Sequence, residues 1–176
     1  GMSQNGHVKN RIAVAAVGGI ADGLDPGQLV IPDQIIDYTW GREFTFHASP
    51  FPVMHIDFTS PYSDEMRTRL LDAARRAELR VADSGTYGAT QGPRLETAAE
   101  IDRMERDGCH IVGMTGMPEA SLARELGLRY ATCALIVNPA AGRADGEITM
   151  AQIEAVLRDA VADVHRLLGA ALSDAS

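Results

Sequence analysis

Short apolar runs bounded by turn residues recur along the chain and predict buried β-strands. The first run, residues 12–17, ends at a pair of glycines, and its length and β-branched content fit a strand buried on both faces. The run 28–38 is interrupted by Pro32, which places it at a sheet edge or a bulge. Three further runs with the same character are residues 79–82, 110–114 and 130–137.

Four segments carry the periodicity and the end signals of helices. Residues 63–79 place apolar side chains on one face and arginines on the other. Residues 97–107 and 149–172 begin with capping-box patterns. Residues 118–126 begin with proline, which suits the first turn of a helix. The alternation of strands and helices predicts an α/β domain with a largely parallel sheet.

A long segment, residues 39–61, shows no helical period but is rich in aromatic side chains. It carries five of the nine aromatic residues, Trp40, Phe44, Phe46, Phe51 and Phe58. Loops of this length are uncommon in compact domains and usually serve an interface or a ligand. We therefore expect an interface or a ligand cover, and the alternative is a flap packed over the sheet.

Composition bounds the class of protein. The 176 residues fit a single domain, expected over residues 11–176, after a polar end at residues 1–10 that is either disordered or derived from a tag. The net charge of -8, with Lys9 as the single lysine, argues against nucleic acid as a partner. Cys109 and Cys133 lie outside any CxxC pattern and are typical of free thiols in a reducing cytoplasm.

Neither a metal site nor a membrane segment is expected. The five histidines form no pair at metal-ligand spacing. No apolar run approaches the roughly 20 residues that a membrane span needs. We therefore expect a cytoplasmic protein without a metal.

Candidate chemistry gathers where the predicted strands end, because ligands of open α/β sheets bind outside the carboxyl ends of the strands. Gly18, Met114-Thr115 and Asn138 occupy such ends, and the segment 85–97 lies between them as a loop. That loop contributes Tyr87, Arg94 and Glu96. Each has a structural alternative: a turn for Gly18 and Asn138, core packing for Met114, a helix start for Glu96 and a surface ion pair for Arg94. Together they predict a site without defining its ligand.

Five sequence motifs occur in an order that is typical of a known protein family. They are VAAVGGI, PGQLVIPDQIIDYT, TQGPRLETAAEI, HIVGMTGMPEASLARELGLRYA and ALIVNPAAG. From about residue 11 to the C-terminus they resemble the purine nucleoside and methylthioadenosine phosphorylases, and most of all the bacterial methylthioinosine phosphorylases. The resemblance implies a three-layer α/β fold with a mixed, mostly parallel sheet. It also implies cleavage of an N-glycosidic bond by phosphate, a co-substrate, with no other cofactor.

The resemblance assigns base recognition and catalysis to Asn138 and Glu96. An asparagine amide can donate to N7 and to a 6-oxo group, and a glutamate can accept from N1–H. Both features fit a 6-oxopurine such as hypoxanthine or guanine. The remaining residues that the resemblance implies for the base pocket are Ala16, Val17, Gly18 and Leu95.

Sugar and phosphate contacts follow from the same resemblance. It implies ribose contacts by Tyr87, Met114, Met150 and His55, the last contributed by a neighbouring subunit of a homotrimer. The apolar Met150 suits a methylthio group at the 5′ position. Phosphate contacts are implied for Thr115 and Ala16.

The chain departs from the family pattern at its start. Family members carry a glycine-rich phosphate loop and an Arg-His-Gly motif before the VGGI strand, and Ala15 stands where relatives often have Thr or Asn. The fold is therefore expected to be truncated, with the first strand as an unprotected edge. Three hypotheses remain open. The chain is a phosphorylase of inosine or methylthioinosine that binds phosphate through Thr115, Arg94 or another subunit, a purine-binding remnant without catalysis, or one part of a split phosphorylase.

Overall fold

The computed structural model describes residues 9–173, so most of the predicted polar end, residues 1–8, lies outside the described residues. The strands are β1 (Asn10–Gly19), β2 (Leu29–Val30), β3 (Gln34–Asp37), β4 (Val81–Ala82), β5 (Thr86–Ala89), β6 (Ile111–Gly113) and β7 (Arg129–Pro139). The helices are α1 (Asp64–Arg76), α2 (Ala98–Arg106), α3 (Glu119–Glu125) and α4 (Met150–Ser173). The strands form one sheet in the order β3-β5-β6-β1-β7-β2-β4.

The sheet is mixed and mostly parallel, as predicted. The pairs β1–β7, β2–β4, β3–β5 and β5–β6 are parallel, whereas β1–β6 and β2–β7 are antiparallel. The prediction of β1 as an edge strand is wrong in part, because β1 lies between β6 and β7. However, β6 pairs only with Gly18 and Gly19, so residues 10–17 have a neighbouring strand on the β7 side alone.

All four predicted helices are confirmed, and side-chain caps explain where α1, α2 and α4 begin. The hydroxyl of Thr149 accepts from the backbone N–H of Gln152, whose side chain accepts in return from the Thr149 N–H, forming the predicted capping box. The Thr97 hydroxyl likewise accepts from the Glu100 N–H. Among residues 9–173, no helix has the length and apolar character needed to cross a bilayer.

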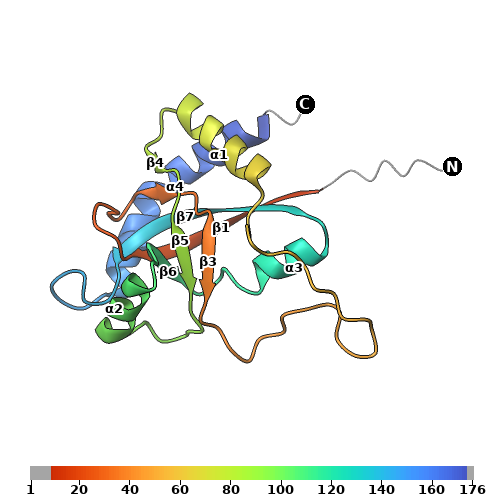
Figure 1. Cartoon of the computed structure of the whole chain (residues 1–176). Coiled ribbons are helices and arrows are strands. Elements are labelled where there is room, and N and C mark those ends of the chain that lie inside the picture. Colours follow the sequence, from red (N-terminus) through yellow and green to blue (C-terminus); the bar gives the residue numbers. More distant parts are fainter. Residues whose placement is uncertain (1–8, 174–176) are drawn as a thin grey trace.

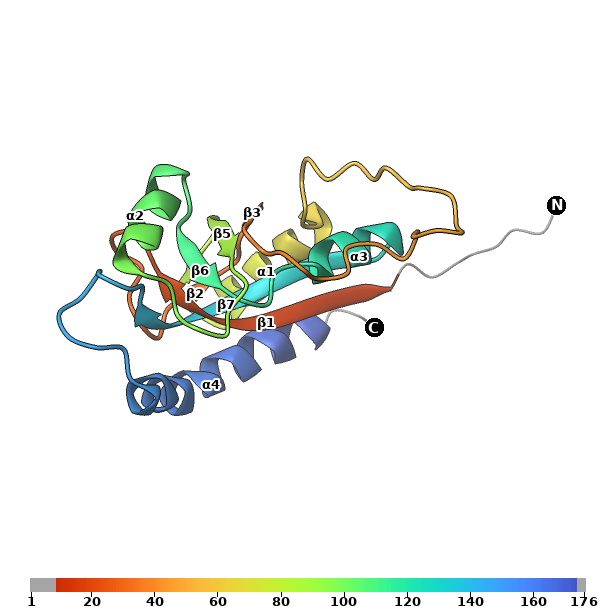
Figure 2. The same cartoon turned by 90° about the horizontal axis from the view of Figure 1, so that it is seen from below.

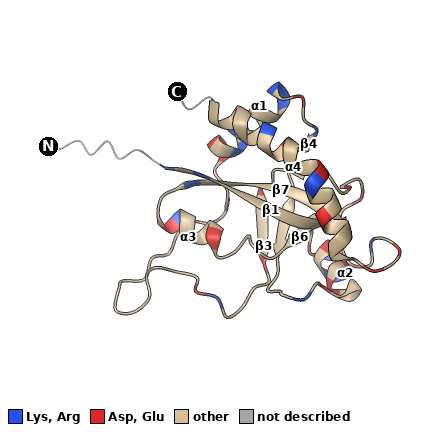
Figure 3. Ribbon diagram, turned by 180° about the vertical axis from the view of Figure 1, so that it is seen from behind, with Lys and Arg blue, Asp and Glu red and all other residues tan. Residues whose placement is uncertain are grey.

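Strand β7 is the centre of two apolar cores, because its alternate side chains point to opposite faces. Ala131, Cys133 and Leu135 pack against α1 and α4 on one face. Ala134 and Ile136 pack with β5 and α3 on the other. Figure 2 shows α4 and α3 on opposite sides of the β1–β7 pair, which gives the three layers. Figure 3 shows charges of both signs on the helices and loops, with the central strands mostly uncharged.

Both cysteines are buried free thiols. Burial raises the pKa of the Cys133 thiol to about 12 and also raises the pKa of Cys109. Because the thiolate is the reactive form, neither side chain is suited to nucleophilic chemistry.

Two strand predictions need correction. The run 28–38 is not one strand, because the chain crosses the sheet at the buried Pro32: β2 lies beside β7 and β3 forms the edge beside β5. Residues 86–89, predicted as loop, form β5. Position 88 of this strand requires a glycine, because a Cβ there would overlap the Met104 methyl and lie 3.0 Å from Cys109 Sγ.

Residues 39–61 form the predicted long loop and extend away from the strands (Figure 1). The side chains of Trp40 and Phe51 are 71% and 64% exposed, which contradicts the alternative of a flap packed on the core. Phe58 is the ring of this loop that packs against the apolar core.

Candidate functional site

A cavity of about 350 Å³ alongside β1 collects all the residues predicted to bind base and phosphate, together with Met114. The predicted residues on its wall are Ala16, Val17, Gly18, Leu95, Glu96, Met114, Thr115 and Asn138. An adjoining cavity of about 630 Å³ shares Leu95, Glu96, Asn138 and Ile148 with it. The amide and the carboxylate thus face the same hollow region, although they come from segments more than forty residues apart in sequence.

Strand direction explains how these segments meet. β1 and β7 run parallel, which places Gly18 opposite Asn138 at one end of the sheet. β6 runs antiparallel to β1 with Gly18 opposite Val112, so the chain leaving β6 runs back along β1. Thr115, which follows the carboxyl end of β6, therefore lies beside β1 and not beyond its end. The cavity is thus lined by residues that follow β6, as predicted, but it extends along β1 instead of lying wholly outside its carboxyl end.

Gly18 allows β1 and β6 to approach each other at the cavity. A Cβ on Gly18 would lie 3.1 Å from Val112 Cγ1 and 3.4 Å from Asn138 Nδ2. The missing side chain therefore leaves room for Val112, and the Asn138 amide lies next to Gly18. This is a more specific role than the turn that the glycine pair alone indicates.

One hydrogen bond orients the Asn138 side chain. Its Nδ2 donates to the Pro139 carbonyl oxygen at 2.6 Å. The second N–H of the amide and the oxygen Oδ1 have no partner among the described residues. A donor and an acceptor therefore remain for a ligand in the cavity.

Glu96 is half-buried and is oriented by a neighbour that the motifs did not single out. Thr90 Oγ1 donates to Glu96 Oε1 at 2.6 Å, and Oε2 has no partner within residues 9–173. Arg94 does not neutralise this carboxylate, because its guanidinium pairs with Glu100 at 3.0 Å. The interpretation of Arg94 as a surface ion pair is thus confirmed.

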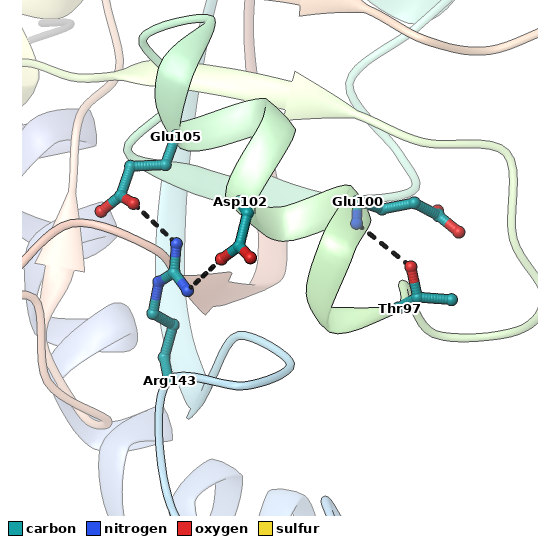
Figure 4. Close-up of polar contacts among 5 residues, drawn as sticks. All are labelled: Thr97, Glu100, Asp102, Glu105 and Arg143. Carbon is teal, nitrogen blue, oxygen red and sulfur yellow. Dashed lines mark hydrogen bonds and ion pairs between the residues drawn. The ribbon is translucent and has the colours of Figure 1, made fainter.

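The loop after β7 is fastened to α2 through Arg143, a residue that sequence reasoning missed. Its guanidinium donates to Asp102 at 2.9 Å and to Glu105 at 2.8 Å (Figure 4). Residues 140–148 line the larger cavity except for Arg143 itself, whose side chain points to α2. Two carboxylates three residues apart on a predicted helix were the available signal.

Tyr87, a predicted ribose contact, lies beneath the cavity and not on its wall. It is fully buried, and its hydroxyl accepts from the Thr115 N–H at 3.4 Å. Burial raises the pKa of this phenol, so it stays protonated. In this position Tyr87 supports the backbone that carries Thr115.

The two other predicted ribose contacts are not brought to the cavity within this chain. Met150 is 66% exposed at the start of α4, and His55 is exposed on the long loop. The contribution of His55 from a neighbouring subunit stays a prediction. Within residues 9–173, no group of three or more His, Cys, Asp or Glu side chains could hold a metal ion.

Arg42, from the long loop, binds the backbone on which the site is built. Its guanidinium donates to the carbonyl oxygens of Met114 at 2.9 Å, Gln91 at 3.0 Å and Thr90 at 3.3 Å, and also to that of Met117. It thereby joins the segment after β5 to the segment after β6. A lone arginine in an aromatic loop gave no sequence signal for this role.

Replacing Arg42 should weaken the fold. We expect Arg42→Ala to lower the free energy of unfolding by about 2 kcal/mol, because several partly buried carbonyl groups lose their donor. Arg42→Lys should recover only part of this loss, since a lysine lacks the planar fork. Urea unfolding measures both variants. Arg94→Ala, which removes an exposed ion pair, is the control and should change stability by less than about 0.5 kcal/mol. Wild-type stability in Arg42→Ala would contradict the assignment.

Several known proteins are similar to this chain in sequence or in structure. Residues 3–173 match the family model described as the Phosphorylase superfamily. A probable S-methyl-5′-thioinosine phosphorylase of Pseudomonas syringae is 54% identical over 163 residues, which cover 92% of this chain and 66% of the relative. A 6-oxopurine nucleoside phosphorylase of Pyrococcus furiosus is 43% identical over 94% of this chain and 64% of its own length.

A solved structure agrees with the fold. Methylthioadenosine phosphorylase from Schistosoma mansoni in complex with adenine superposes with a TM-score of 0.90 at 30% identity, covering 94% of this chain and 65% of that one. The chain spans 60–66% of the length of the first curated relatives that it matches. The sequence match and the shared fold lead to one conclusion: this chain belongs to the Phosphorylase superfamily.

Proposed function

We propose that the protein is a pentosyltransferase that cleaves 6-oxopurine nucleosides, inosine or 5′-methylthioinosine, with phosphate. The observation that carries the proposal is the shared cavity of Asn138 and Glu96, in which the amide keeps a free N–H and the carboxylate a free oxygen. A 6-oxopurine presents the matching N7 and 6-oxo acceptors and the N1–H donor. The names of the methylthioinosine and 6-oxopurine nucleoside phosphorylases among its relatives support this substrate class.

The side chains act by orienting the nucleoside and stabilising charge. As the glycosidic bond breaks, positive charge develops on the sugar and negative charge on the base. The Asn138 N–H donates to the base as this negative charge grows, and Glu96 Oε2 holds N1–H. Met114 lies against the sugar, and the Thr115 hydroxyl meets the phosphate. Both line the 350 Å³ cavity.

The finer parts of the proposal rest on family resemblance. They are a homotrimer in which His55 of a neighbouring subunit completes the sugar site, an approach of Met150 to the ribose, and a role in purine salvage in the cytoplasm. Phosphate is the co-substrate, with no cofactor.

The direct test is base release from the purified chain. We expect hypoxanthine from both inosine and 5′-methylthioinosine, only when phosphate is present. The second product should be ribose 1-phosphate from inosine and 5-methylthioribose 1-phosphate from methylthioinosine. Chromatography with and without phosphate measures both products, and adenosine serves as the control substrate. Absence of phosphate-dependent release would contradict the proposed reaction.

A second candidate, purine binding without turnover, is favoured by the charges around the cavities. The charged side chains on their walls are Glu96, Asp145 and Glu147, all acidic. This lining repels a phosphate dianion but not a neutral base. Titration calorimetry with hypoxanthine separates the candidates, because binding of the base without release from nucleosides identifies the second.

A further inference from the structure

Thr90 directly follows β5, and hydrogen bonds of its backbone fix its position. Its N–H donates to the Gly113 carbonyl oxygen at 2.8 Å, and its own carbonyl oxygen accepts from Arg42 at 3.3 Å. These two bonds fix the Thr90 backbone next to the end of β6, so its hydroxyl is held at a defined place.

The hydroxyl carries a single proton and has two acceptors within reach. Glu96 Oε1 lies at 2.6 Å and the Gly113 carbonyl oxygen at 3.3 Å. The shorter contact to an ionised acceptor is the stronger one, so the proton goes to Glu96. The Gly113 oxygen is already satisfied by the Thr90 N–H, and it does not need the hydroxyl.

Glu96 lines two neighbouring cavities, so this hydrogen bond can decide which of them its carboxylate faces. Besides the 350 Å³ cavity, Glu96 lines a smaller polar cavity of about 180 Å³ together with Thr90 and Gln91. A glutamate without a tether can turn its carboxylate to either side, at the cost of rotamer freedom when one side is chosen. The Thr90 hydroxyl makes this choice by holding Oε1 and leaving Oε2 as the free acceptor.

We propose that Thr90 is a positioning residue that determines base specificity, because its hydroxyl fixes Glu96 so that Oε2 accepts N1–H of a 6-oxopurine. The inference rests on the proposed function. Adenine presents an acceptor at N1, which opposes a fixed carboxylate oxygen, so the same hydrogen bond favours hypoxanthine and disfavours adenine.

The test compares the affinities of hypoxanthine and adenine by titration calorimetry. Thr90→Val keeps the shape of the side chain and removes the hydroxyl. We expect its affinity for hypoxanthine to fall about tenfold, or about 1.4 kcal/mol, while its affinity for adenine stays the same or rises. Thr90→Ser keeps the hydroxyl and should retain the wild-type ratio within about twofold. Thr90→Ala gives the same readout if the valine variant does not fold.

Thr86→Val is the matched control, since it makes the same change at the start of β5, the strand that Thr90 follows, and Thr86 lines neither cavity. Wild-type discrimination in folded Thr90→Val and Thr90→Ala would overturn the inference and leave the proposed function standing. A wild-type chain that binds neither base, and releases none, would overturn the proposed function and this inference with it.

Discussion

Asn138→Asp should lower the affinity for hypoxanthine by roughly 100-fold or more, because the site loses a donor and gains a charge. The wild-type Nδ2 lies 2.6 Å from the Pro139 carbonyl oxygen, and a carboxylate oxygen there would face another acceptor. The remaining oxygen could only accept, which conflicts with N7 and the 6-oxo group of the base. Adenine should suffer less, since its 6-amino group can donate to the new carboxylate. Calorimetry with both bases measures the effect.

Asn10→Asp makes the same change of charge at the exposed start of β1 and is the control for this experiment. Its affinities should match those of the wild type. Equal hypoxanthine affinity in Asn138→Asp and in the wild type would remove the assignment of the base site, and with it the main support for the proposed substrate class.

Gly113→Ala should lower the free energy of unfolding by about 2–3 kcal/mol through overpacking. The added Cβ would overlap the Tyr87 hydroxyl and lie 3.1 Å from both Tyr87 Cζ and Val17 Cγ1. The Tyr87 ring is fully buried and cannot retreat toward solvent. Its displacement should also break the hydrogen bond from the Thr115 N–H, so the effect reaches the cavity wall. Chemical denaturation measures the loss of stability.

Gly169→Ala is the matched control, because a Cβ at this exposed position of α4 meets no atom within 4 Å. Alanine has the higher helix propensity, so this variant should be as stable as the wild type or up to about 1 kcal/mol more stable. If Gly113→Ala behaved in the same way, the tight packing of Tyr87 against β6 would be disproved.

Sequence reasoning succeeded where local signals determine local structure. Capping threonines such as Thr97 and Thr149 bind the backbone within three residues, so the helix starts could be predicted. β5 was not predicted, because Gly88 stands where strands typically carry β-branched residues. The glycine is required by the contact with Met104 of α2, which the local sequence does not show. The division of residues 28–38 at Pro32 depends on which strands each half meets, which is again a tertiary effect.

The same distinction holds for the site. Family motifs predicted Asn138 and Glu96, and the structure places both on one cavity wall. The roles of Thr90 and Arg42 were not predicted, because a threonine before a loop and an arginine among aromatic residues are common in sequences and carry no specific signal. Their roles arise from hydrogen bonds across 6 and 72 positions of sequence, to Glu96 and to the Met114 carbonyl respectively.

The incomplete pairing of β1 bears on how the site can change during evolution. Residues 14–17 line the 350 Å³ cavity, and β6 leaves their main-chain groups on that side without a neighbouring strand. Peptide N–H and C=O groups in this stretch are available for direct contact with a bound molecule. Recognition through peptide groups survives replacement of side chains. Drift at Val14 or Ala16 can therefore alter the shape of the pocket while the polar character of this wall is inherited unchanged.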